Sequence, residues 1–243
     1  ALKSAEISDF KELTARLSKK PADGAITKAM VAVKDADGNK VDVEDVTVNK
    51  STVKIKTAKK LAVTGKYTIE IEGMGSQTAI AGALVRTDAF DKAYAYDGDD
   101  LGATFKEART GFKVWAPTAT KVELVIYKST DPNAEVDKTI DMTGEDKGVW
   151  SATVKKLASG TAYSYKLTFA DGTVNTSSDP YATAAVANGE RSVVLSKEDM
   201  GSAGKRMPAF GKTTDATIAE MNIRDFSINP ASGISADKQG KYL

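Results

Sequence analysis

The stretch that decides the fold is Tyr163-Ser164-Tyr165-Lys166-Leu167-Thr168-Phe169, in which large apolar side chains alternate with small or polar ones. Successive side chains of a β-strand point to opposite faces, so the apolar positions of this stretch share one face. An aromatic row of this kind is typical of the core wall of a β-sandwich. The stretch therefore predicts a strand that lines a buried core.

The same period of two recurs on both sides of this stretch, in short runs separated by turn residues. The runs are residues 29–34, 41–43, 46–48, 53–56, 67–71, 112–115, 122–127, 150–154 and 192–195. Residues 5–20 fit both helical spacing and alternation, and we interpret them as strand. Short alternating runs at this spacing indicate antiparallel β-sandwiches.

Composition excludes several classes of function. Lys+Arg number 34 and Asp+Glu 33, a balance that leaves a formal charge of +1 and predicts no nucleic-acid partner. No apolar run is long enough for a membrane-spanning helix, so we expect no membrane insertion. The sequence contains no His and no Cys. These absences remove Ser-His-Asp and Cys-His catalysis, thiolate or imidazole metal sites and disulfides from this chain.

The order of the runs predicts the domain organisation. A cluster of Tyr, Asp and Gly at 94–102 marks a junction, and residues 199–215 are rich in Gly, Ser, Lys and Thr, as in a linker. Ile218 to Phe226 is a compact apolar run that resembles a strand buried on both faces, as in a parallel sheet. We predict an all-β chain of two β-sandwich domains in series, residues 1–92 and 93–198. The linker 199–215 then leads to a last segment, residues 216–243, which contains this run.

Several motifs of the second half resemble known families. Phe112-Lys113-Val114-Trp115-Ala116-Pro117, followed by Val122-Glu123-Leu124, resembles the opening of carbohydrate-binding module family forty-eight. Agreement continues at Gly148-Val149-Trp150, Tyr163-Ser164-Tyr165-Lys166 and Asp179-Pro180-Tyr181-Ala182. Residues 96–103 are similar to the lead-in of type I pullulanases, and Glu220 to Ser227 to the first barrel strand of glycoside hydrolase family thirteen. Gly240-Lys241-Tyr242-Leu243 resembles the loop that follows this strand.

The resemblance implies that both β-sandwich domains are immunoglobulin-like and that residues 93–198 form the carbohydrate-binding module. It implies that residues 216–243 contain the first strand of a truncated (β/α)8 barrel. It further implies the N-terminal, non-catalytic part of a debranching enzyme that hydrolyses α-1,6-glucosidic bonds in pullulan, amylopectin or glycogen. Its implied partners are α-glucan and the missing catalytic barrel. Retaining glycosidases need two carboxyl groups about 5–5.5 Å apart, and the family takes its catalytic carboxylates from later barrel strands. We therefore expect this chain alone to be inactive, to have no catalytic residues and to act as a scaffold or a weak glucan-binding module.

Candidate glucan contacts are Trp115, Tyr94 and Tyr96. Trp115 lies on the opposite face from Phe112 and Val114, so it serves either as a glucan platform or as packing at a domain boundary. Trp150 shares its face with other apolar residues and is predicted to be core. In glycogen-binding members of the resembled family, a turn before the closing Asp-Pro carries a tryptophan. The matching turn here, Asp171 to Asn175, has Val174 and no aromatic ring.

Asp97, Asp99 and Asp100 are the only weak candidates for a metal site. Their carboxylates suit Ca²⁺, which prefers oxygen ligands. Acidic residues in a turn are more often solvated than metal-bound, and we expect no cofactor.

Two other classes of function fit parts of the sequence. One is a free-standing α-glucan-binding protein or an immunoglobulin-like surface protein, and the other is the front of an isoamylase or branching enzyme. The resemblance implies a bacterial protein located outside the cell or at its surface, with its leader already removed. The absence of cysteine is equally compatible with a bacterial cytoplasm.

Overall fold

A computed structural model describes residues 1–201, 204 and 208–241. The predicted linker, residues 199–215, lies partly outside these described residues. Tyr242 and Leu243 of the predicted loop after the barrel strand lie outside them. The chain divides into two units, residues 1–201 and 202–243. No helix among the described residues is long and apolar enough to cross a membrane.

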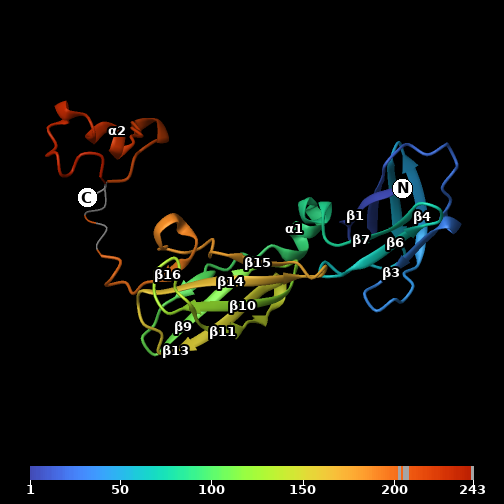
Figure 1. The fold of residues 1–243 in the computed structure, drawn as a ribbon, viewed down its shortest axis with the longest axis horizontal. Helices are drawn as coiled ribbons and strands as arrows, with labels where there is room; N and C mark the ends of the chain where they lie inside the picture. Colours follow the sequence, from blue (N-terminus) through green and yellow to red (C-terminus); the bar gives the residue numbers. More distant parts are fainter. Residues whose placement is uncertain (202–203, 205–207, 242–243) are drawn as a thin grey trace. The chain divides into compact units, whose positions relative to one another are not determined.

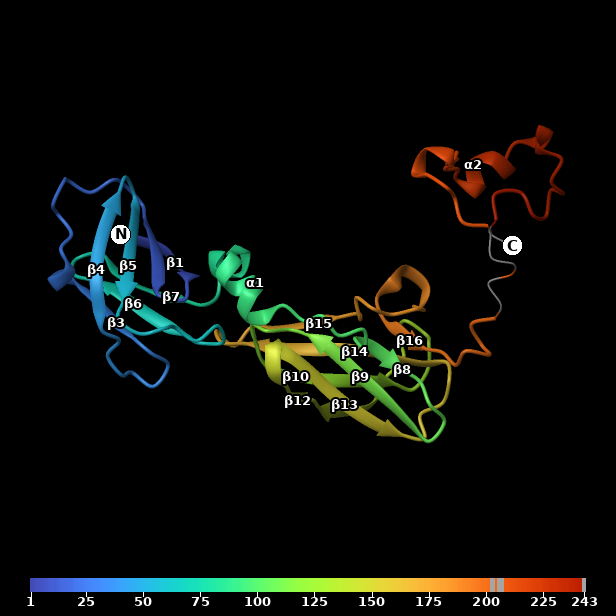
Figure 2. The ribbon, with the colours of Figure 1, turned by 180° about the vertical axis from the view of Figure 1, so that it is seen from behind.

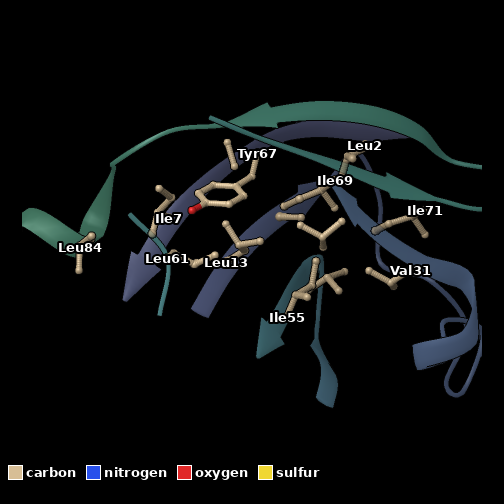
Figure 3. Packing of buried hydrophobic residues seen from close by; sticks show 14 of the residues in the cluster. Leu2, Ile7, Leu13, Val31, Ile55, Leu61, Tyr67, Ile69, Ile71 and Leu84 are labelled. Atoms are coloured by element: carbon tan, nitrogen blue, oxygen red, sulfur yellow. The ribbon is translucent and has the colours of Figure 1, made fainter. Parts of the chain in front are cut away.

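The first β-sandwich is formed by strands β1 to β7 (Figure 1). One sheet has the order β1-β2-β5-β4 and the other the order β3-β6-β7. Their bounds are β1 Leu2–Asp9, β2 Glu12–Leu17, β3 Val31–Lys34, β4 Val43–Asn49, β5 Thr52–Thr57, β6 Tyr67–Ile71 and β7 Gly75–Ala79. Alternation sets the faces: Ile55 is buried between the sheets, whereas its neighbours Lys54 and Lys56 are exposed. Figure 3 shows the core of this sandwich, with Leu13, Ile55 and Ile69 in its packed interior.

The second β-sandwich is formed by strands β8 to β16 (Figure 2). One sheet has the order β12-β13-β9-β8, and the other the order β11-β10-β14-β15, with β16 also pairing with β14. Their bounds are β8 Gly102–Thr104, β9 Arg109–Trp115, β10 Ala119–Tyr127, β11 Val136–Asp141, β12 Thr143–Gly144, β13 Val149–Lys155, β14 Thr161–Phe169, β15 Val174–Ser177 and β16 Ser192–Val194. The prediction of an all-β chain, including strands within residues 5–20, is confirmed.

The aromatic row predicted to line a core does so. Tyr163 and Tyr165 of β14 are fully buried, and the ring of Phe112 on β9 meets that of Tyr163 edge to face at 5.0 Å between centroids. Trp150 of β13 packs against the same core, and its Nε1–H donates to the carbonyl oxygen of Ala116 at 3.1 Å. The prediction that Trp150 is a core residue is therefore confirmed.

A short helix, α1 (Asp88–Tyr94), leads from the first sandwich to the second. It begins where the Thr87 hydroxyl accepts the backbone N–H of Phe90, which satisfies one of the unpaired donors of a helix start. Phe90 belongs to the first core, yet its ring also contacts Trp115 of β9. The domain boundary between residues 92 and 93 falls inside this helix and stays a prediction.

The remaining helical segments are short. They are η1 Lys28–Met30, η2 Ala83–Arg86, η3 Asp146–Gly148, η4 Ala187–Gly189, η5 Thr213–Asp215, η6 Pro230–Ser232 and α2 Ile223–Ser227.

The predicted barrel strand at Ile218 to Phe226 is wrong in this structure. Residues 216–222 have no regular structure, and α2 begins at Ile223. Ile218 is 89% exposed and Phe226 67% exposed, so the apolar run is not buried. A strand without a hydrogen-bonded neighbour leaves its backbone groups unpaired. The Asn222 side chain instead accepts the backbone N–H of Arg224 at 3.0 Å, which starts a helix locally.

Candidate functional site

An open groove of about 320 Å³ lies on the second sandwich where three separate segments of the chain meet. We call it the aromatic groove; it is lined by Tyr96, Leu101, Val114, Trp115, Pro180 and Tyr181. Two of the three predicted glucan contacts, Tyr96 and Trp115, therefore face the same space. The third, Tyr94, does not line it.

Trp115, the last residue of β9, is held firmly at the edge of the groove. Its Nε1–H is shared between the carbonyl oxygens of Tyr94 at 2.9 Å and Lys147 at 3.0 Å. The edge of the Phe90 ring packs against it at 6.3 Å between centroids. Even so, 42% of Trp115 remains exposed. The residue thus packs between α1 and β9 and also presents a fixed aromatic surface to solvent.

Tyr94 and Tyr96 have different surroundings. The Tyr94 ring stacks on Phe90 at 4.8 Å, so Tyr94 supports Trp115 through its carbonyl group rather than offering its own ring. The Tyr96 ring folds back over Gly98, where a Cβ atom would overlap it. Glycine at this position is what allows Tyr96 to form one wall of the groove.

A small ionic network borders the Tyr96 wall. The Tyr96 hydroxyl donates to Asp100, whose other carboxylate oxygen accepts from Lys113 Nζ at 2.7 Å. Lys113 also pairs with Glu145 at 3.5 Å. The hydrogen bond from Lys113 lowers the pKa of Asp100, and the hydrogen bond to Asp100 raises the pKa of Lys113. Both groups are therefore charged at neutral pH and neutralise each other.

Tyr181 forms the opposite wall and is 59% exposed. Its backbone N–H donates to Asp179 Oδ1 at 2.8 Å, which fixes the turn that carries it. A Cβ atom on Gly102 would lie 3.0 Å from the Tyr181 Cβ, and Gly102 has a left-handed φ of +95°. Because only glycine combines this backbone angle with this close approach, Gly102 sets where Tyr181 sits.

Asp179 connects the Tyr181 wall to the core. It is 5% exposed, and its Oδ2 accepts the hydroxyls of Tyr163 at 2.7 Å and Tyr165 at 3.1 Å. Burial, reinforced by the Asp179 charge, raises the pKa of both phenols. They therefore remain protonated donors at neutral pH. A buried carboxylate with this many donors is well compensated for the loss of water.

The acidic turn does not gather into a metal site among the described residues, which contain no group of three or more carboxylates able to hold an ion. Of the three weak candidates, Asp100 is engaged by Tyr96 and Lys113.

The other outer surface of this sandwich carries a group of ion pairs, and the ring of Tyr127, on the same face, is covered by Arg191 at 3.6 Å. Glu123 of β10 pairs with Lys121 at 2.9 Å and with Lys166 of β14 at 3.1 Å, and Lys121 also pairs with Asp141 at 2.8 Å. We call Lys121, Glu123, Asp141 and Lys166 the charged face. Val174 begins the edge strand of the same sheet and is 48% exposed. The turn from Asp171 to Asn175, which contains Val174, offers no ring on which a sugar could stack.

Sequence reasoning missed Pro180, Tyr181 and Leu101 as groove residues. The Asp-Pro-Tyr motif was visible, but nothing local indicates that its tyrosine faces Trp115, which lies 66 positions earlier in the chain. The pairing depends on Asp179 and Gly102, whose roles appear only in three dimensions.

Comparison with known sequences assigns the region that bears the groove. Residues 100–182 match the family model of carbohydrate-binding module 48, described as the isoamylase N-terminal domain. A pullulanase of Bacillus subtilis (strain 168) is 40% identical over 162 residues, which cover 67% of this chain and 21% of that protein. Pullulanase 1, chloroplastic, of Arabidopsis thaliana is 31% identical over 185 residues, 71% of this chain and 18% of that protein. The chain thus spans about a fifth of these relatives.

Solved structures agree. The crystal structure of a pullulanase from Anoxybacillus sp. LM18-11 superposes with a TM-score of 0.74 and 30% identity, covering 99% of this chain and 34% of that one. A structure of the same protein complexed with maltotetraose gives a TM-score of 0.72 over 98% of this chain and 32% of that one. The pullulanase from Bacillus acidopullulyticus, 20% identical with a TM-score of 0.83 over 100% of this chain and 43% of that one, shares the fold. The chain is therefore an N-terminal region of the pullulanase family, and residues 100–182 form its carbohydrate-binding module 48.

Proposed function

We propose that this chain is the non-catalytic part of a debranching hydrolase that cleaves α-1,6-glucosidic bonds in pullulan, amylopectin or glycogen. In this proposal the chain supports the catalytic barrel and binds α-glucan weakly. Support comes from the module at residues 100–182 and from pullulanase relatives, one of which is described in complex with maltotetraose.

The observation that carries the binding proposal is the exposed indole of Trp115. Its N–H is already satisfied by two backbone carbonyls, so the exposed part of the ring needs no polar partner from a ligand. A large, flat and preorganised aromatic surface is well suited to stack against a sugar ring.

The carboxylates at the groove argue against catalysis there. A glycosidase needs a carboxyl group with a raised pKa to protonate the leaving oxygen. Lys113 has the opposite effect on Asp100, because it lowers the pKa of that carboxyl group. Asp100 is therefore ionised at neutral pH and is a poor general acid there.

One experiment separates the two parts of this proposal. The purified chain should be retarded in a native gel that contains amylopectin. In a separate assay it should release no reducing sugar from pullulan. Mobility equal to that in a gel without polysaccharide contradicts the binding part. Reducing-sugar release from pullulan contradicts the non-catalytic part.

A further inference from the structure

The two walls of the aromatic groove come from segments that lie far apart in the sequence. Trp115 ends β9, whereas Pro180 and Tyr181 follow β15, a strand of the other sheet, by a few residues. The Trp115 ring is held by two hydrogen bonds before any ligand arrives, and the backbone turn that carries Tyr181 is held by Asp179 and Gly102. A ring and a turn that are already held reduce the entropy lost on binding.

The chemistry of the lining identifies the class of ligand. None of the six lining residues carries a charge, and the nearby ions Asp100, Lys113 and Glu145 are paired with one another. An anionic or cationic ligand would find no unpaired countercharge in this lining. A neutral ligand with apolar faces and many hydroxyl groups fits, because its faces can lie on the rings while its hydroxyls reach the polar border.

The volume of the groove, and its difference from a larger depression on the first sandwich, support a glucan ligand. A volume of about 320 Å³ lies at the lower end for small-molecule pockets, which suits a short stretch of a longer chain. A larger depression of about 520 Å³, beside β3 and the start of β4, is lined by aliphatic and charged residues and contains no aromatic ring.

We propose that the aromatic groove is the α-glucan-binding site of this chain, with Trp115 as its fixed platform and Tyr181 as its second wall. This inference rests on the proposed function and adds the position of the site and a residue that decides its affinity. Asp179 acts as a positioning residue, because it holds the turn that carries Tyr181 and touches no ligand itself.

The test is a titration of the purified chain with maltotetraose, followed by tryptophan emission and by retardation in amylopectin gels. Both tryptophans of the chain lie in the second sandwich, and Trp115 is the more exposed of the two. Tyr181→Ala should weaken binding about tenfold, equivalent to about 1.4 kcal/mol. Tyr181→Phe keeps the ring and should stay within about twofold of the unaltered chain.

The matched control is Val174→Ala, which trims another exposed apolar residue at the edge of the opposite sheet. This variant should bind as the unaltered chain does, and cellotetraose should not compete, because its linkages give a differently shaped chain. If the unaltered chain binds maltotetraose and Tyr181→Ala binds it equally well, the position of the site is wrong while the proposed function stands. An unaltered chain that binds neither maltotetraose nor amylopectin overturns both. Equal binding of cellotetraose overturns the assignment to α-glucans.

Discussion

The two outer surfaces of the second sandwich are built by the same strand alternation, yet they differ in chemistry. On the charged face, side chains of neighbouring strands satisfy one another, so that Glu123 lies between Lys121 and Lys166. On the other sheet, Trp115 finds its partners outside the sheet, and segments before β8 and after β15 complete the aromatic groove. A sheet surface that pairs within itself offers little to a ligand. One that is completed by loops can hold a shaped site.

Removing the Asp179 carboxylate should have the largest effect on the free energy of unfolding. It should also release the turn of Tyr181, which distinguishes the groove surface from the charged face. Asp179→Ala leaves the Tyr163 and Tyr165 hydroxyls without their acceptor in the core and frees the turn of Tyr181. We expect a loss of about 3 kcal/mol in the free energy of unfolding, since each unsatisfied buried donor costs about 1–3 kcal/mol. Urea unfolding followed by tryptophan emission measures it. Asp179→Asn, which keeps one acceptor oxygen, should lose less; equal losses for the two variants would argue against the hydrogen bonds as the cause.

Alkaline pH should weaken the core that both surfaces share. Burial raises the pKa of Tyr163 and Tyr165 in the folded state above the value of about 10 of an exposed tyrosine. Above that pH the unfolded chain loses protons that the folded chain keeps, so stability is full below pH 10 and declines as the pH rises further. The decline should be about 1–3 kcal/mol per pH unit, since each such group contributes up to about 1.4 kcal/mol. Urea midpoints at pH 9, 10 and 11 test this, and a constant midpoint would contradict it.

Two glycine variants, one beside each surface, separate backbone strain from the position of Tyr181. Gly102 and Gly172 have similar left-handed φ angles, +95° and +90°, but only Gly102 has a neighbour, Tyr181, where a Cβ atom would stand. Gly102→Ala and Gly172→Ala should each cost about 1–2 kcal/mol of stability from backbone strain. Only Gly102→Ala should also weaken the retardation by amylopectin. Equal retardation of the two variants would mean that the position of Tyr181 does not matter for binding.

Neutralising the charged face should have the smallest effect. Lys121 and Lys166 lower the pKa of Glu123, which shows that the pairs favour the ionised form. Ion pairs near the surface nevertheless contribute little, so Glu123→Gln should change the free energy of unfolding by less than about 1 kcal/mol. Affinity for maltotetraose should remain unchanged. A loss of affinity would place the glucan on this face instead and reverse the comparison.

The fold could be predicted from the sequence wherever the alternation was strong. The row from Tyr163 to Phe169 specifies a core strand, because shifting it by one residue would expose every large side chain. Weak signals were missed: β8, β12 and β15 are only two to four residues long. The run from Ile218 to Phe226 misled, because a short apolar run has the same pattern in a buried strand and in an exposed segment that ends in a helix.

The candidate site was only half predictable. Trp115 was recognised from its position on the outward face of β9, and Tyr96 from the unusual density of Tyr and Asp at the junction. The acceptors of the Trp115 N–H are backbone carbonyls of residues 21 and 32 positions away, which no side-chain pattern reveals. The sequence left two roles open for Trp115, a glucan platform and packing at a domain boundary. Trp115 packs against Phe90 and α1, and its role as a platform stays a prediction.

The shared N–H of Trp115 has a consequence for where this binding module begins. One of its acceptors, Tyr94, and one lining residue, Tyr96, precede the stretch 100–182 that the family describes. A protein trimmed to that stretch would lack a wall of the groove and half of the anchoring of its tryptophan, and it would also lose β16, which pairs with β14. The smallest piece that retains the complete groove therefore starts upstream of the module, at α1.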